Sequence, residues 1–83
     1  MNYWINANAG TVSISSDFKI PQTIIDTLTK VNGIDSVEIA FETVYCIVNS
    51  QHKPIEVKDY IEGVLDQYII DFQNNNIKQI QTD

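Results

Sequence analysis

Cys46 and His52 are the two side chains of this chain whose types would suit a catalytic pair. A thiol nucleophile needs a base within hydrogen-bond reach and a further group that orients the base. Cys46, however, lies in an apolar run typical of a strand, where a cysteine is usually a small buried hydrophobe with an inert thiol. His52 lies six residues further on, in a polar link beside Lys53. We therefore expect no catalytic residues and a protein that is not an enzyme.

A metal or cofactor site has equally little support. Zinc sites use paired cysteines or histidines, and this chain has one of each, so that carboxylates would have to complete any ligand set. The three glycines, Gly10, Gly33 and Gly63, are scattered and do not form a phosphate-binding loop. We expect no metal and no cofactor.

The carboxylates of Asp59, Glu62 and Asp66 are spaced so that they lie along one side of a helix. Such a row is usually a solvated face, and the alternative is an acidic ridge that meets a partner. We keep these three residues as candidate partner-binding residues.

The charge balance argues against nucleic acid as the partner. The chain of 83 residues has a formal net charge of −6, and its five cationic side chains are all lysines. Arginine, which makes the bidentate contacts with phosphate and guanine, is absent, and the acidic excess repels a polyanion. We expect no nucleic-acid binding.

Length and cysteine content set further bounds. A chain this short builds a single core of modest stability. Binding to a protein partner or to a second copy would therefore add usefully to the stability of the fold. The lone cysteine and the lack of a charged and then apolar leader predict a reducing, cytoplasmic setting. No apolar run approaches the roughly 20 residues that cross a bilayer, so we expect no membrane association.

The N-terminal part is predicted to be a β-hairpin. Residues 2–7 and 11–16 alternate with period two, and Val12 and Ile14 share one face of the second run. Gly10 in the link can adopt the positive φ that a hairpin turn needs. Trp4 is either a core anchor or a partner contact, and the core is favoured because small domains need large buried rings.

Two amphipathic helices are predicted. The first spans residues 21–31 and is closed by Gly33 in a left-handed position. The second begins at Pro54 and carries a wide apolar face as far as Phe72. Gly63 inside this helix weakens it, so we expect a close approach to the sheet there.

Between the helices, residues 33–49 are predicted to be a second hairpin with its turn near Phe41 and Glu42. The unbroken apolar run of residues 43–48 indicates a strand that is central or covered on both faces. Because a slip of one residue exchanges the faces, either Tyr45 or Cys46 could point inward.

The predicted architecture is α+β, with a four-stranded, mainly antiparallel sheet and two helices on one face, in the order ββαββα. Residues 1–73 form the single domain, and residues 74–83 are expected to be a frayed polar tail. The other sheet face would then be open. We expect Tyr3, Trp4 and Tyr45 to share that face and to favour a protein partner or a second copy.

Two stretches resemble the N-terminal domain of Nfu-type iron–sulfur scaffold proteins. Residues 7–14, Ala-Asn-Ala-Gly-Thr-Val-Ser-Ile, are similar to the family pattern Pro-Asn-Pro-Asn-Thr-Leu-Lys-Phe, with Asn8 and Thr11 matching and alanines in place of both prolines. Residues 33–39 and 44–48 resemble the family's helix exit and hairpin, and a long final helix follows in both.

The resemblance implies an α+β fold and an accessory role in iron–sulfur cluster assembly. In that family the cluster is held by a Cys-x-x-Cys of a separate C-terminal domain, and this chain contains no such motif. We therefore expect a non-catalytic protein-interaction or adaptor module. The alternatives are an accessory protein of cluster assembly and a small acidic phage-encoded regulator of a host protein.

Overall fold

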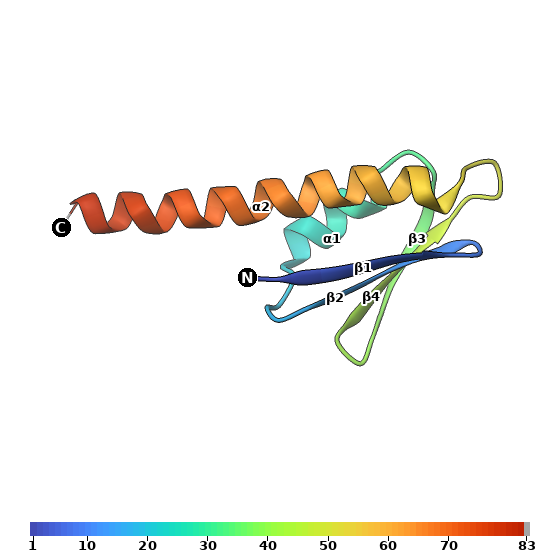
Figure 1. Cartoon of the computed structure of the whole chain (residues 1–83), viewed down its shortest axis with the longest axis horizontal. Coiled ribbons are helices and arrows are strands. Elements are labelled where there is room, and N and C mark those ends of the chain that lie inside the picture. The colour runs from blue at the N-terminus through green and yellow to red at the C-terminus, as the bar shows by residue number, and fades with distance from the viewer. Residues whose placement is uncertain (83) are drawn as a thin grey trace.

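The computed structural model describes the backbone of residues 1–82 and the side chains of residues 1–75 (Figure 1). Its elements are β1 (Tyr3–Asn8), β2 (Thr11–Ser16), α1 (Gln22–Thr29), β3 (Ile34–Ala40), β4 (Thr43–Val48) and α2 (Pro54–Thr82). The predicted α+β class and the order ββαββα are confirmed.

All four strands belong to one antiparallel sheet with the order β1-β2-β4-β3. The apolar run of residues 43–48 forms β4, which lies inside the sheet between β2 and β3, as the sequence predicted. Strands β1 and β3 form the two edges. The N-terminal and central hairpins therefore meet along β2 and β4.

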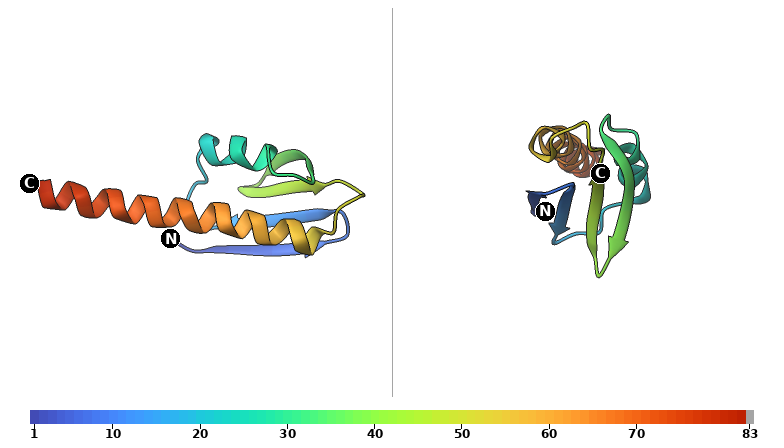
Figure 2. Two further views of the ribbon diagram at one scale, coloured as in Figure 1. Left: turned by 90° about the horizontal axis from the view of Figure 1, so that it is seen from above. Right: turned by 90° about the vertical axis from the view of Figure 1, so that its right-hand side faces the viewer.

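Both helices cover the same face of the sheet (Figure 2). Helix α2 contacts β1 and β2, whereas α1 contacts β3, and the two helices also contact each other. The core between these layers consists of Val12, Ile14, Ile25, Leu28, Ile34, Val44, Cys46, Val48, Val57, Ile61 and Leu65. One sheet face is thus buried by the helices and the other is left open.

Strand alternation decides which side chains enter that core. Val12 pairs with Cys46 and Ile14 pairs with Val44, so these four side chains share the helix-covered face. Cys46 is fully buried, and Tyr45 beside it faces outward. The register that the sequence left open is therefore the one with Cys46 inside.

Helix α1 is shorter than the predicted span of residues 21–31. It begins directly after Pro21, whose carbonyl accepts hydrogen bonds from the N–H groups of Ile24 and Ile25. Gly33 has φ 101°, a left-handed conformation that glycine adopts without strain. The N–H of Ile34 then donates to Val31, and the buried Ile34 side chain returns the chain to the core.

Helix α2 runs to Thr82, so the backbone is helical through most of the stretch 74–83 that we expected to fray (Figure 1). Residues 73–82 contain neither glycine nor proline, so nothing in this stretch breaks the helix. Asp83 lies outside the described residues.

The close approach to the sheet that we expected at Gly63 is wrong, because a β-carbon there would have nothing within 4 Å. Across the part of the chain that the structure describes, no helix combines the length and apolar character that crossing a membrane requires.

Candidate functional site

The helices leave one face of the sheet uncovered. Alternate residues of all four strands form it, and their pairing fixes their neighbours across the sheet. Its members are Trp4, Asn6, Asn8, Thr11, Ser13, Ser15, Ser36, Glu38, Ala40, Thr43, Tyr45 and Ile47. We call this surface the outer face. Glu38 is the only charged residue in this set, although the chain as a whole has a net charge of −6.

Trp4 and Tyr45 are the two aromatic residues of the outer face. Trp4 lies on the edge strand β1 and is 57% exposed, and Tyr45 lies on β4 and is 36% exposed. Ser15 pairs with Trp4 and Ser13 pairs with Tyr45, so small side chains of β2 lie between the two rings. The outer face therefore carries two rigid amphipathic rings, with the small polar side chains of Ser13 and Ser15 between them.

Two expectations about these aromatic residues are wrong. Tyr3 does not share the outer face with Trp4, because consecutive residues of a strand point to opposite sides of the sheet. Trp4 is not a core anchor, since the alternation that turns Tyr3, Ile5 and Ala7 toward the helices turns Trp4 to the open side. The placement expected for Trp4 and Tyr45 on the outer face is confirmed.

Tyr3 instead joins β1 to α2. Its hydroxyl donates a hydrogen bond to Oδ1 of Asp66 across 2.6 Å. Burial of the ring, followed by this bond and the negative charges of Asp66 and Glu62, raises the pKa of Tyr3 above its ordinary value. Tyr3 is therefore a protonated hydroxyl donor within the fold at neutral pH.

The acidic row of α2 is partly engaged within the chain. Asp66 accepts the bond from Tyr3, and Glu62 forms an ion pair with Lys58 at 3.6 Å. Asp59 is exposed. Asp66 and Glu62 thus lie on the side of α2 that faces Tyr3 of β1. Contact of the row with a partner stays a prediction.

Among the residues that the structure describes, no hydrogen bond joins the side chains of Cys46 and His52. The thiol of Cys46 is enclosed in the core, and burial raises its pKa to about 11, the reverse of what activates a nucleophile. The ring of His52 packs beside Gly33 and Val57, and its buried Nδ1 has no hydrogen-bond partner among the described residues. Within the same residues, no group of three or more His, Cys, Asp or Glu side chains is placed to hold a metal ion.

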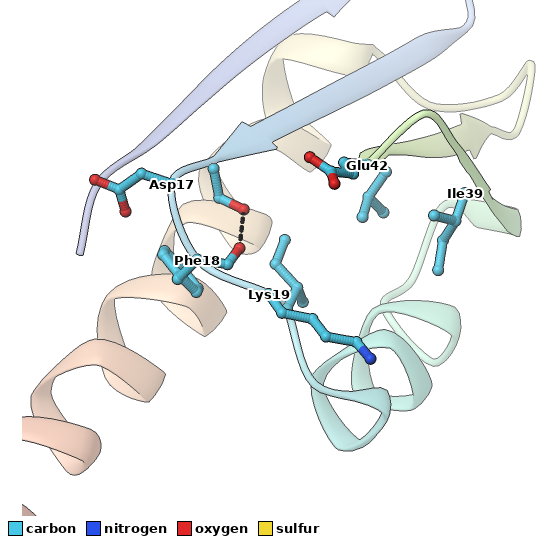
Figure 3. Close-up of a pocket in the computed structure, with 8 residues that line it drawn as sticks. Asp17, Phe18, Lys19, Ile39 and Glu42 are labelled. Atoms are coloured by element: carbon cyan, nitrogen blue, oxygen red, sulfur yellow. Dashed lines mark hydrogen bonds between the residues drawn. The ribbon is translucent and has the colours of Figure 1, made fainter.

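The structure also has a hollow that the sequence did not indicate. A pocket of about 630 Å³ opens between the link from β2 to α1 and the hairpin of β3 and β4 (Figure 3). Its lining consists of Ser16, Asp17, Phe18, Lys19, Ile20, Ile39, Glu42 and Val44. A smaller hollow of about 380 Å³ lies beside His52 and Tyr60, near the start of α2. Neither could be located without the packing of segments distant in the sequence.

Comparisons of this chain with protein-family models, with curated proteins and with solved structures find no match. Function must therefore be inferred from the surfaces of the chain itself.

Proposed function

We propose that this chain is a non-catalytic protein-interaction module and that the outer face binds the protein partner. The observation that carries the proposal is the composition of that face. Tryptophan, tyrosine, serine, threonine and asparagine dominate it, and Glu38 is its only charged member. Depletion of charge together with aromatic side chains distinguishes the centre of a protein interface from ordinary surface.

The residue types also suit binding energetically. Tryptophan and tyrosine bring large rigid areas at a low cost in conformational entropy, and serine and asparagine supply adaptable hydrogen bonds. Covering about 100 Å² of the exposed Trp4 ring would stabilise a complex by about 2–3 kcal/mol. Trp4 is therefore the expected hot spot, with Tyr45 as the second anchor.

The cytoplasm is part of this proposal, because Cys46 is a free thiol and a reducing compartment keeps such a thiol reduced. The Nfu-like accessory role and the phage-regulator role remain predictions. The first requires co-purification with a cluster carrier or its apo-targets. The second requires binding through the acidic surface, which salt would weaken strongly.

The test is capture from a native lysate by the tagged chain and by the double variant Trp4→Ser/Tyr45→Ser. Both side chains are exposed, so the variant is expected to fold. Tyr60→Ala is the matched control, because Tyr60 is 69% exposed on α2, away from the outer face. A partner retained by the parent chain and by Tyr60→Ala, and lost by the double variant, supports the proposal. Equal capture by all three chains, or no capture by any, contradicts it.

A further inference from the structure

The tip of the hairpin between β3 and β4 carries an unusual turn. Ala40 pairs with Thr43, so Phe41 and Glu42 form a two-residue loop. Their φ angles are 50° and 67°, both in the left-handed region. Two-residue turns with positive φ at both positions strongly prefer Asn-Gly, because other side chains are strained there. Here a phenylalanine and a glutamate occupy both strained positions.

Burial within the monomer does not offset the strain at Phe41. Left-handed backbone costs a residue other than glycine on the order of 1–2 kcal/mol, and the side chain of Phe41 is 101% exposed, so no apolar burial offsets the cost. A lone exposed apolar residue is ordinary on a protein surface, but a strained one at a loop tip indicates a constraint from function. A partner that buries Phe41 would supply the missing stabilisation.

The pocket of about 630 Å³ lies directly beside this tip (Figure 3). It opens because β2 and β4 are paired only as far as Ile14 and Val44, beyond which the hairpin and the β2–α1 link diverge. The apolar part of its lining consists of Phe18, Ile20, Ile39 and Val44. Ile39, although it pairs with the buried Val44, is 59% exposed, so this end of the core is incompletely covered.

The geometry points to a second copy of this chain as the occupant: Phe41 of each copy inserts into this pocket of the other. A projecting tip and a receiving pocket on neighbouring segments make a self-complementary patch, and such a patch forms a closed two-fold dimer. Each copy then provides the apolar side chain that the other's pocket lacks.

The charges beside the tip and the pocket fit the same arrangement. Glu42 follows Phe41 on the tip, and Lys19 is the one cation among the residues that line the pocket. The carboxylates on the same wall are Glu42 itself and Asp17, and Asp17 accepts hydrogen bonds from the backbone N–H and the side-chain amide of Asn2. Figure 3 shows the carboxylate of Glu42 and the ammonium group of Lys19 on different sides of the hollow, and no ion pair among the described side chains includes either residue. An inserted tip carries Glu42 of one copy toward Lys19 of the other, so the exchange pairs two charges that are free in the monomer.

The expected dimer is weak and reversible. A phenylalanine side chain buries about 150–250 Å², so the two exchanged rings and the walls around them remain near or below the roughly 1,000 Å² of a stable specific interface. The apolar wall of the pocket, with Ile39 and Val44, lies on the helix-covered side of the sheet, whereas Trp4 and Tyr45 lie on the outer face. Phe41, Glu42 and Lys19 are not members of the outer face, so their variants test the dimer separately from the proposed function.

The first experiment is sedimentation equilibrium of the whole chain up to millimolar concentration. The parent chain is expected to dimerise, and Phe41→Asn is expected to weaken dimerisation by about tenfold or more. This variant keeps a residue that tolerates positive φ, so it should melt no lower than the parent. Tyr60→Ala is the matched control and should dimerise like the parent. A strict monomer overturns the proposal, as does a dimer that survives Phe41→Asn, which would assign the contact to another surface such as the C-terminal part of α2.

The second experiment tests the exchange itself. Lys19→Glu and Glu42→Lys each place like charges opposite one another in a homodimer and should each weaken dimerisation. Mixed in equal amounts, the two variants restore an opposite-charge pair at both contacts, so a heterodimer is expected at concentrations where each variant alone is monomeric. Failure of the mixture to associate more tightly than the single variants overturns the reciprocal arrangement.

Discussion

The hydroxyl of Tyr3 donates to the carboxylate of Asp66 across 2.6 Å, and this bond fastens the edge strand β1 to helix α2. The two residues are 63 positions apart in the sequence, so the contact closes the fold from the first strand to the last helix. It gives Tyr3 and Asp66 a role within the fold, while their contact with a partner stays a prediction. The consequences can be measured as changes in stability.

Replacing Tyr3 by phenylalanine removes the donor and keeps the ring. Because the bond lies near the surface, we expect the free energy of unfolding to fall by about 1 kcal/mol. Urea denaturation at neutral pH measures this change. Asp66→Asn is the matched control, since an amide oxygen can still accept the bond. An unchanged free energy of unfolding in Tyr3→Phe would contradict a stabilising role.

The raised pKa of Tyr3 also predicts a pH dependence. The folded chain holds the phenolic proton of Tyr3 more tightly than the unfolded chain, in which tyrosine ionises at about pH 10. The stabilisation is therefore complete below about pH 10 and is lost as pH rises through the higher folded value. Stability should decline more steeply above this pH in the parent than in Tyr3→Phe. Both chains retain Cys46, so its ionisation cancels in the comparison.

Gly33 and Gly63 should respond in opposite directions to alanine. At Gly33, φ is 101° and a β-carbon would lie 2.9 Å from Cγ of His52, so Gly33→Ala should destabilise the fold by about 2 kcal/mol or more. At Gly63 the space is open and the backbone is helical, so Gly63→Ala should stabilise it by about 1 kcal/mol. Thermal unfolding of the two variants checks whether stability falls in Gly33→Ala and rises in Gly63→Ala. A destabilised Gly63→Ala would mean that something approaches this side of α2.

The thiol of Cys46 should be protected in the native state. It is fully buried and its pKa is raised to about 11, so a thiol reagent should modify it only when the fold opens. Labelling in native buffer should be slow and should accelerate in urea in step with unfolding. Rapid labelling of the folded chain would show that the thiol is accessible and would return Cys46 to the candidate chemistry.

Local patterns in the sequence were enough for the elements, their order and much of the core. Period-two alternation placed Val12 and Ile14 inside, and the glycine at position 33 marked the exit of α1. The same alternation, applied to consecutive residues, would have separated Tyr3 from Trp4. Which of them faces the helices depends on the register between β1 and β2, and that register is a property of the sheet.

The remainder of the candidate sites depends on tertiary packing. The pocket beside the hairpin tip exists because β2 and β4 stop pairing after Ile14 and Val44, and no local pattern reports where two strands diverge. The bond of Tyr3 to Asp66 is equally non-local. One local signal was available: the predicted turn carries Phe41 and Glu42 in place of the Asn-Gly that such a turn prefers.

Binding through the outer face should depend little on salt. Glu38 is the only charged residue among the members of this face, so counterion screening has little to weaken. The dissociation constant for the captured partner should change less than about threefold between low and moderate ionic strength. A steep loss of affinity with salt would instead favour the acidic row of Asp59, Glu62 and Asp66 as the contact.

Titration of the captured partner into the isotope-labelled chain, followed by backbone and indole NMR signals, tests the central claim most directly. The account predicts that the largest shifts map to the outer face, including the indole N–H of Trp4 and the amides of Ser13, Ser15 and Tyr45. Shifts confined to α1 and α2, with the Trp4 indole unmoved, would contradict it.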